Sequence, residues 1–87
     1  MPKLVLLSTP AQKQFEWLEA APRSRIRKAL ERLASGGRLD IRRLKGVKGR
    51  EDLLRLRVGD YRVIYRDDPD AIRVVQIIHR ARGYDWL

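Results

Sequence analysis

The amino-acid sequence predicts a small α+β domain in the order βααβββ, an antiparallel sheet with a helical hairpin packed on one face. Two observations predict this class. Apolar residues recur at helical spacing between residues 9 and 35, and the spacing changes to every second residue between 52 and 79. A chain of 87 residues with 44% hydrophobic content suits one folded domain, which we assign to residues 1–87.

The first strand and first helix are predicted at the N-terminus. Residues 3–8 are mostly apolar and lie between two prolines, which is typical of a short strand. Thr9 fits the N-cap of the following helix, Pro10 its first position, and Gln12 a capping box. We expect the helix to end before Pro22, because the residue before a proline is driven out of the helical region. The buried face of this helix would comprise Ala11, Phe15 and Leu18.

A second amphipathic helix is predicted from Pro22 to the glycine pair at positions 36 and 37. Its apolar stripe comprises Ile26, Ala29, Leu30 and Leu33, and its remaining surface is basic: Arg23, Arg25, Arg27, Lys28 and Arg32. Residues 38–49 are predicted to be irregular and basic, anchored by Leu39, Ile41 and Leu44.

Three strands follow at residues 52–58, 61–66 and 71–79. Gly59-Asp60 predicts a two-residue hairpin turn, so Val58 would pair with Tyr61 and Arg57 with Arg62. Because side chains alternate between faces, one face would be apolar and meet the helices. It carries Leu54, Leu56, Val58, Tyr61, Val63 and Tyr65, and the opposite face carries Arg55, Arg57, Arg62 and Arg66. Those arginines either bind an anion or form a solvated face.

The third strand is apolar on both sides, as expected for a strand covered on both faces. Alternation places Ala71, Val75 and Ile77 on one side. It places Ile72, Val74 and Ile78 on the other, followed by Arg80, which would join the arginine face.

The charge of the chain predicts a polyanionic partner: nucleic acid, a phosphate-rich ligand or an acidic protein. Lys and Arg total 20 against 11 Asp and Glu, a net charge of +9, and arginine, which forks onto phosphates, supplies 15 of the 20. The absence of cysteine excludes disulfides and thiolate metal sites, and one histidine cannot by itself build a zinc site. The apolar run at 4–7 is too short for a signal peptide or membrane span, so we expect a soluble cytoplasmic protein with no membrane partner.

Titratable side chains collect after the third strand, at His79, Arg80, Arg82 and Tyr84. A histidine, two arginines and a tyrosine could perform acid–base chemistry on a phosphodiester. Alternatively, Tyr84 packs on the sheet and His79 hydrogen-bonds locally. The aspartates at 67, 68 and 70 are interpreted as a turn rather than a cation site.

The segments RRLKGVKGREDLLRLRVGDYRVIYR and IRVVQIIHRARGY resemble the RelE/ParE superfamily of toxins from type II toxin–antitoxin modules, with the RelE branch nearer. The resemblance covers nearly the whole chain. It implies a ribosome-dependent endoribonuclease (mRNA interferase) that cleaves mRNA in the ribosomal A site without metal or other cofactor. Its implied partners are the ribosome, mRNA and a cognate, RelB-like antitoxin.

The resemblance also implies roles for individual residues. Arg62 would hold the scissile phosphate, Arg80 would stabilise the transition state or help the leaving group, and Tyr84 would orient or deprotonate the 2′-hydroxyl. Arg55 falls where the family has the second of two strand lysines, but Leu53 falls where it has the first. This departure shifts acid–base work onto Tyr84, His79 or Arg55. The predicted RNA-binding residues are Lys45, Lys48, Arg57, Arg66, His79 and Arg82.

Two other functions stay open. A ParE-like protein would inhibit DNA gyrase without nuclease activity, and that branch generally lacks the terminal pair formed here by Arg80 and Tyr84. A non-catalytic RNA-binding module would use the same basic surface without cleaving.

Overall fold

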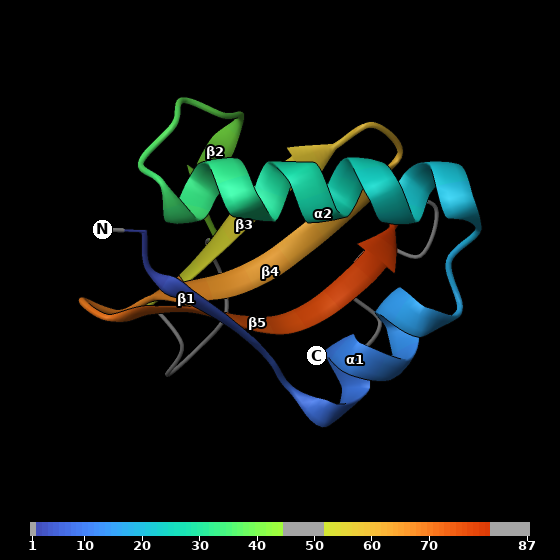
Figure 1. Cartoon of the computed structure of the whole chain (residues 1–87), viewed down its shortest axis with the longest axis horizontal. Helices are drawn as coiled ribbons and strands as arrows, with labels where there is room; N and C mark the ends of the chain where they lie inside the picture. Colours follow the sequence, from blue (N-terminus) through green and yellow to red (C-terminus); the bar gives the residue numbers. More distant parts are fainter. Residues whose placement is uncertain (1, 45–51, 81–87) are drawn as a thin grey trace.

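The computed structural model describes residues 2–44 and 52–80. The elements are β1 (Leu4–Leu7), α1 (Thr9–Glu16), α2 (Ala20–Ala34), β2 (Ile41–Arg43), β3 (Leu53–Val58), β4 (Tyr61–Asp67) and β5 (Ala71–His79). They form one five-stranded sheet in the order β1-β5-β4-β3-β2, with α2 lying across one face (Figure 1). This arrangement confirms the α+β class, with both helices contributing to one core.

The central hairpin has the predicted register. Val58 lies opposite Tyr61, and Arg57 opposite Arg62. Gly59 has a φ of +58°, whereas no non-glycine residue of the described chain has a positive φ. A positive φ at the first central position alone is the geometry of a type II′ turn, whose twist matches the flanking strands. The turn therefore sets which side chains share each face.

The sheet differs from the prediction at both edges. β1 runs parallel to β5, with Leu4 opposite Ala71, so the sheet is mixed rather than wholly antiparallel. Parallel pairing is possible because a long connection, which contains both helices and strands β2 to β4, joins these two strands. At the other edge, β2 pairs with β3 inside the segment predicted to be irregular, with Arg42 opposite Arg55. Three residues are too few for an alternating pattern to be recognised.

Both helix starts lie before the predicted positions. Ser8, not Thr9, is the N-cap of α1, and its Oγ accepts a 3.1 Å hydrogen bond from the Ala11 N–H. The predicted capping box of Thr9 and Gln12 is therefore wrong. α2 begins at Ala20 rather than Pro22. Proline is tolerated there because the first turn of a helix needs no intrahelical bond from its N–H groups.

The C-terminus of α2 ends as the glycine pair predicts. Gly36 has a φ of +81°, its N–H donates to Leu33 O at 3.0 Å, and the Gly37 N–H donates to Arg32 O at 2.8 Å. These two bonds form a Schellman motif, which satisfies carbonyls that the helix end would otherwise leave unpaired.

A β-bulge changes the alternation of β5. Ile64 lies opposite Gln76 but Tyr65 lies opposite Val74, so β5 holds one extra residue, Val75. An extra residue inverts the faces of all residues beyond it. Ile77 therefore joins Ile72 and Val74 in the core beneath the helices, and the predicted grouping of Ile77 with Val75 is wrong.

Each face of the sheet has its own core. The larger core lies beneath the helices and includes Ala11, Ile26, Leu30, Ala34, Leu56, Val63, Tyr65, Ile72, Val74 and Ile77. A smaller cluster lies on the opposite face and comprises Leu44, Leu53 and Ile64, with Val75 packed against it. The face predicted to carry the arginines thus also contains a buried apolar strip.

Helix α1 covers the part of the β5 edge that β1 leaves open. The Ser8 hydroxyl donates to Val75 O at 2.7 Å. Gln14 Oε1 accepts from the Ile77 N–H at 2.7 Å, and Gln14 Nε2 donates to Gln76 Oε1 at 2.5 Å. An uncovered strand edge is a template for aggregation, so these bonds protect it.

Candidate nucleic-acid interface

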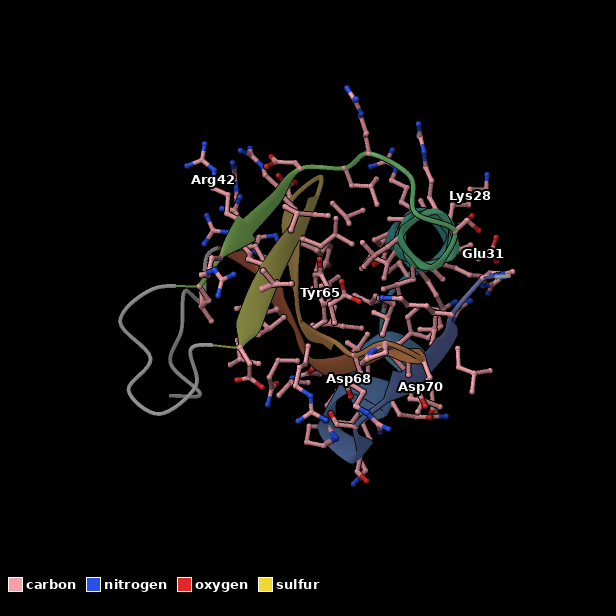
Figure 2. All side chains as sticks on the ribbon, turned by 90° about the vertical axis from the view of Figure 1, so that its left-hand side faces the viewer. Lys28, Glu31, Arg42, Tyr65, Asp68 and Asp70 are labelled. Atoms are coloured by element: carbon pink, nitrogen blue, oxygen red, sulfur yellow. The ribbon has the colours of Figure 1, made fainter. Side chains whose placement is uncertain are left out.

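Four arginines lie side by side on the sheet face opposite the helices. Arg42 on β2 is directly across from Arg55 on β3, and Arg57 on β3 is directly across from Arg62 on β4. Arg55 and Arg57 are two residues apart and so share this face. Figure 2 shows Arg42 pointing away from α2, on the far side of the sheet. We call these four residues the arginine face.

The arginine face carries more positive charge than the described residues neutralise. No ion pair joins Arg42, Arg57 or Arg62 to an acidic residue within residues 2–44 and 52–80. Like charges placed directly opposite each other destabilise a sheet. A bound phosphate would remove this repulsion, and guanidinium groups match phosphate oxygens in geometry.

Arg55 differs from its three neighbours. Its Nη2 lies 3.4 Å from Asp40 Oδ1, and its side chain is only 16% exposed. Its Nε is buried and lacks a hydrogen-bond partner in the described structure. Arg55 is thus held against the sheet, while Arg57 beside it is exposed.

Arg66 differs from the arginine face because its guanidinium group binds acidic residues of the protein. Its Nε and Nη2 donate to the two carboxylate oxygens of Asp68 at 2.9 and 3.0 Å, and Asp52 lies 3.9 Å away. Asp68 also accepts from Arg73 Nε at 2.6 Å. The hydrogen bond with Arg66 lowers the pKa of Asp68, and the same bond raises the pKa of Arg66. Arg66 is therefore neutralised within the protein, unlike Arg57 and Arg62.

Arg80 follows β5 and is tied to the hairpin turn. Its N–H donates to Asp60 O at 2.8 Å, and its Nε lies 3.5 Å from Asp60 Oδ1. The side chain remains 62% exposed. Ile78, two residues earlier, lies opposite Arg62, which places Arg80 at the same end of the sheet as Arg57 and Arg62.

His79 lies on the other side of the sheet from the arginines. It pairs with Tyr61 across the strands, and the two rings meet edge to face with centroids 5.2 Å apart. Tyr61 packs against the core beneath the helices, so His79 also belongs to that side. The structure therefore separates His79 from Arg57 and Arg62.

The remaining predicted site residues, Lys45, Lys48, Arg82 and Tyr84, lie outside the described residues. Leu53, where the resemblance implies a lysine, has 0% exposure and belongs to the smaller core. Strand β3 nevertheless carries two cations two residues apart on the arginine face, Arg55 and Arg57. These two positions preserve the spacing of a cationic pair.

Sequence reasoning missed Arg42 as a member of the site. One signal in the sequence could have identified Arg42. Ile41 packs toward the core beneath the helices, whereas the next residue, Arg42, does not. A two-residue alternation in a segment predicted to be irregular is too short to indicate a strand.

Residues 2–44 and 52–80 lack two further features. No helix there is long and apolar enough to cross a membrane, and no group of three His, Cys, Asp or Glu side chains is arranged to hold a metal ion.

The fold is that of RelE-like toxins. A family profile described as "ParE toxin of type II toxin-antitoxin system, parDE" matches residues 5–84. The chain therefore belongs to this toxin family, within the RelE/ParE superfamily.

Solved structures agree with this assignment. RelE in the RelB–RelE antitoxin–toxin complex of Methanococcus jannaschii is 29% identical, with a TM-score of 0.68 over 94% of this chain and 98% of that one. The RelE–RelB complex of Pyrococcus horikoshii gives 28% identity and a TM-score of 0.68 over 95% and 100%. Free Escherichia coli RelE shares the fold, with 17% identity and a TM-score of 0.69 over 95% and 88%. No curated protein sequence matches the chain.

Proposed function

We propose that this protein is a ribosome-dependent mRNA endoribonuclease, the toxin of a type II toxin–antitoxin pair. One observation carries the proposal: the exposed Arg57 lies directly across from the half-buried Arg62, and neither has an acidic partner among the described residues. Arg55 lies beside them on β3, and Arg80 is anchored at the same end of the sheet. This group of arginines is suited to bind an RNA phosphodiester, whose negative charge increases in the transition state of cleavage.

The proposed reaction is attack of the ribose 2′-hydroxyl on the adjacent phosphorus. The 2′-oxygen loses its proton and bonds to phosphorus, and the bond to the 5′-oxygen breaks as that oxygen gains a proton. Negative charge accumulates on the phosphorane oxygens, where fixed cations stabilise the transition state more than the ground state. We assign Arg62 to holding the scissile phosphate and Arg80 to stabilising the developing charge.

The proton transfers are assigned from the family resemblance. Tyr84 would orient or deprotonate the 2′-hydroxyl. Tyrosine is a weak base at neutral pH, but nearby cations favour its charged form and lower its pKa. We place Arg42 and Arg57 in RNA binding, while Lys45, Lys48 and Arg82 stay predictions for that role.

The proposed neutralising partner is a cognate antitoxin. The two solved relatives at 28–29% identity are toxins bound to RelB antitoxins. An acidic segment that orders on binding would match the arginine face in charge and would block access of RNA to it. We place the activity in the cytoplasm, where ribosomes and mRNA are found.

The test is cleavage of mRNA on translating ribosomes, mapped by primer extension. We expect discrete breaks with the wild-type protein and about 10²–10³-fold slower cleavage after Arg62→Ala or Arg80→Ala, the loss typical of one charge-stabilising group. Arg27→Ala is the matched control, since it removes the same charge from an exposed position on α2. Equal rates for all three variants would refute the assignment.

Gyrase inhibition is the second candidate, because the family profile that matches the chain is described as a ParE toxin. Expression in growing cells separates the two activities. Growth arrest with intact mRNA and a DNA-damage response would overturn the nuclease proposal in favour of a gyrase inhibitor.

A further inference from the structure

Asp40 is an acidic residue next to the arginine face. It directly precedes β2, and its carbonyl oxygen accepts a 3.0 Å hydrogen bond from the Arg57 N–H. Its Oδ1 lies 3.4 Å from Arg55 Nη2. One residue thus contacts two neighbouring arginines of β3, by main chain and by side chain.

The two partners differ in exposure. The Arg55 side chain is 16% exposed, whereas that of Asp40 is 52% exposed. Arg55 also lies directly across from Arg42, so repulsion between the two guanidinium groups pushes Arg55 off the sheet. The carboxylate of Asp40 opposes that movement, because it attracts the Arg55 guanidinium.

Arg55 retains an unused donor. Its Nε is buried and has no hydrogen-bond partner among the described residues. Buried donors are nearly always paired in folded proteins, so an unpaired one calls for an explanation such as a bound water or ion, strain or a catalytic role. The contact with Asp40 therefore orients the Arg55 guanidinium, while its Nε–H has no hydrogen-bond partner among the described residues.

We propose that Asp40 is a positioning residue, which holds the Arg55 guanidinium where it can meet a phosphate together with Arg57 and Arg62. This inference rests on the proposed nuclease function. Asp40 touches no substrate in this scheme and acts through Arg55. Its removal would leave a flexible cation in place of an oriented one.

The directions in which RNA affinity and cleavage rate change distinguish a positioning role for Asp40 from other roles. Asp40→Asn removes a negative charge, so affinity for single-stranded RNA should stay equal or rise, since the basic surface gains net charge. Cleavage at saturating protein should instead fall by about 10–100-fold, the loss expected when a catalytic group is misplaced by about 1 Å. A damaged fold would lower both quantities, and an inhibitory carboxylate would raise both when removed.

The experiment measures single-turnover cleavage on programmed ribosomes and binding of a labelled oligouridine, for wild type, Asp40→Asn and Asp40→Glu. Asp40→Glu should recover part of the cleavage rate, because the carboxylate is retained. Asp70→Asn is the matched control, with the same charge change at an exposed turn residue. It should leave both quantities near wild type.

A third measurement does not depend on catalysis. In ¹H–¹⁵N spectra, the buried Arg55 Nε–H should give a resolved signal, identified by its loss in Arg55→Lys, that weakens in Asp40→Asn. If the wild type does not cleave but this signal depends on Asp40, the nuclease proposal fails while the positioning contact stands. If Asp40→Asn leaves both the signal and the cleavage rate unchanged, the positioning role is overturned.

Discussion

Replacing Leu53 by lysine tests how far the family pattern applies to this chain. The resemblance implies a lysine at this position, so Leu53→Lys would restore the pattern. The structure instead predicts that the substitution lowers stability, because the Leu53 side chain is 0% exposed and packs with Leu44 and Ile64. Arg66, directly across on β4, is paired with Asp68 and offers the new ammonium group no counter-charge.

The magnitude follows from what the substitution removes and adds. Truncating a fully buried leucine costs about 2–5 kcal/mol, and a charge without a partner adds a desolvation penalty. We expect Leu53→Lys to lower the free energy of unfolding by about 3–5 kcal/mol, a large share of the roughly 4–13 kcal/mol typical of a chain this long. The melting temperature should fall by more than about 12 °C.

Urea denaturation followed by circular dichroism measures this loss. Leu53→Met is the matched control, because a volume-conserving change should cost less than about 1.5 kcal/mol. Arg55→Lys controls for a lysine on the same face and should leave the fold nearly intact. A Leu53→Lys variant with wild-type midpoint and faster mRNA cleavage would refute the reasoning, since it would mean that this position can serve the site.

Three other substitutions test the framework. Gly36→Ala should lower stability by about 1–2 kcal/mol in thermal melts, because a φ of +81° is strained for a residue with a Cβ; an unchanged melting temperature would contradict the Schellman geometry. Ser8→Ala should cost about 1–2 kcal/mol in urea titration through loss of the N-cap and of the bond to Val75 O, and a smaller effect than Thr9→Ala would contradict the cap. Burial, with the charge of Asp67, raises the pKa of Tyr65 to about 12. The contribution of Tyr65 to stability is therefore fully present below pH 10 and should fall by up to about 3 kcal/mol as pH rises from 10 to 12, a loss that Tyr65→Phe should largely remove in paired alkaline melts.

The central hairpin and the second helix were predictable because local rules determine them. Gly59-Asp60 selects the turn, and alternation then assigns each side chain of β3 and β4 to a face. The bulge at Val75 was not predictable in this way. Nothing in an evenly apolar strand signals an extra residue, so the predicted groupings of Ile77 with Val75 and of Ile78 with Ile72 and Val74 were wrong.

Pairing between distant segments was the other source of error. The parallel pairing of β1 with β5 depends on how the helices cross the sheet, which no local pattern records. For the site, alternation placed Arg55, Arg57 and Arg62 together, as the structure shows. It could not show that Arg66 is neutralised by Asp68, because a charge pair that follows a strand end depends on the path of the next turn.

The pairing of β1 with β5 has a consequence for the order in which the chain folds during synthesis. β1 lies at the sheet edge beside β5, and α1 hydrogen-bonds to β5 through Ser8 and Gln14. The N-terminal segment therefore has no strand to join until residues 71–79 have left the ribosome. We expect the local β3–β4 hairpin to form early and β1 to dock last, because contacts between distant segments form slowly. A chain interrupted before β5 would expose an unpaired apolar strand and would lack Arg80, so incomplete translation products should be recognised as misfolded rather than act as toxins.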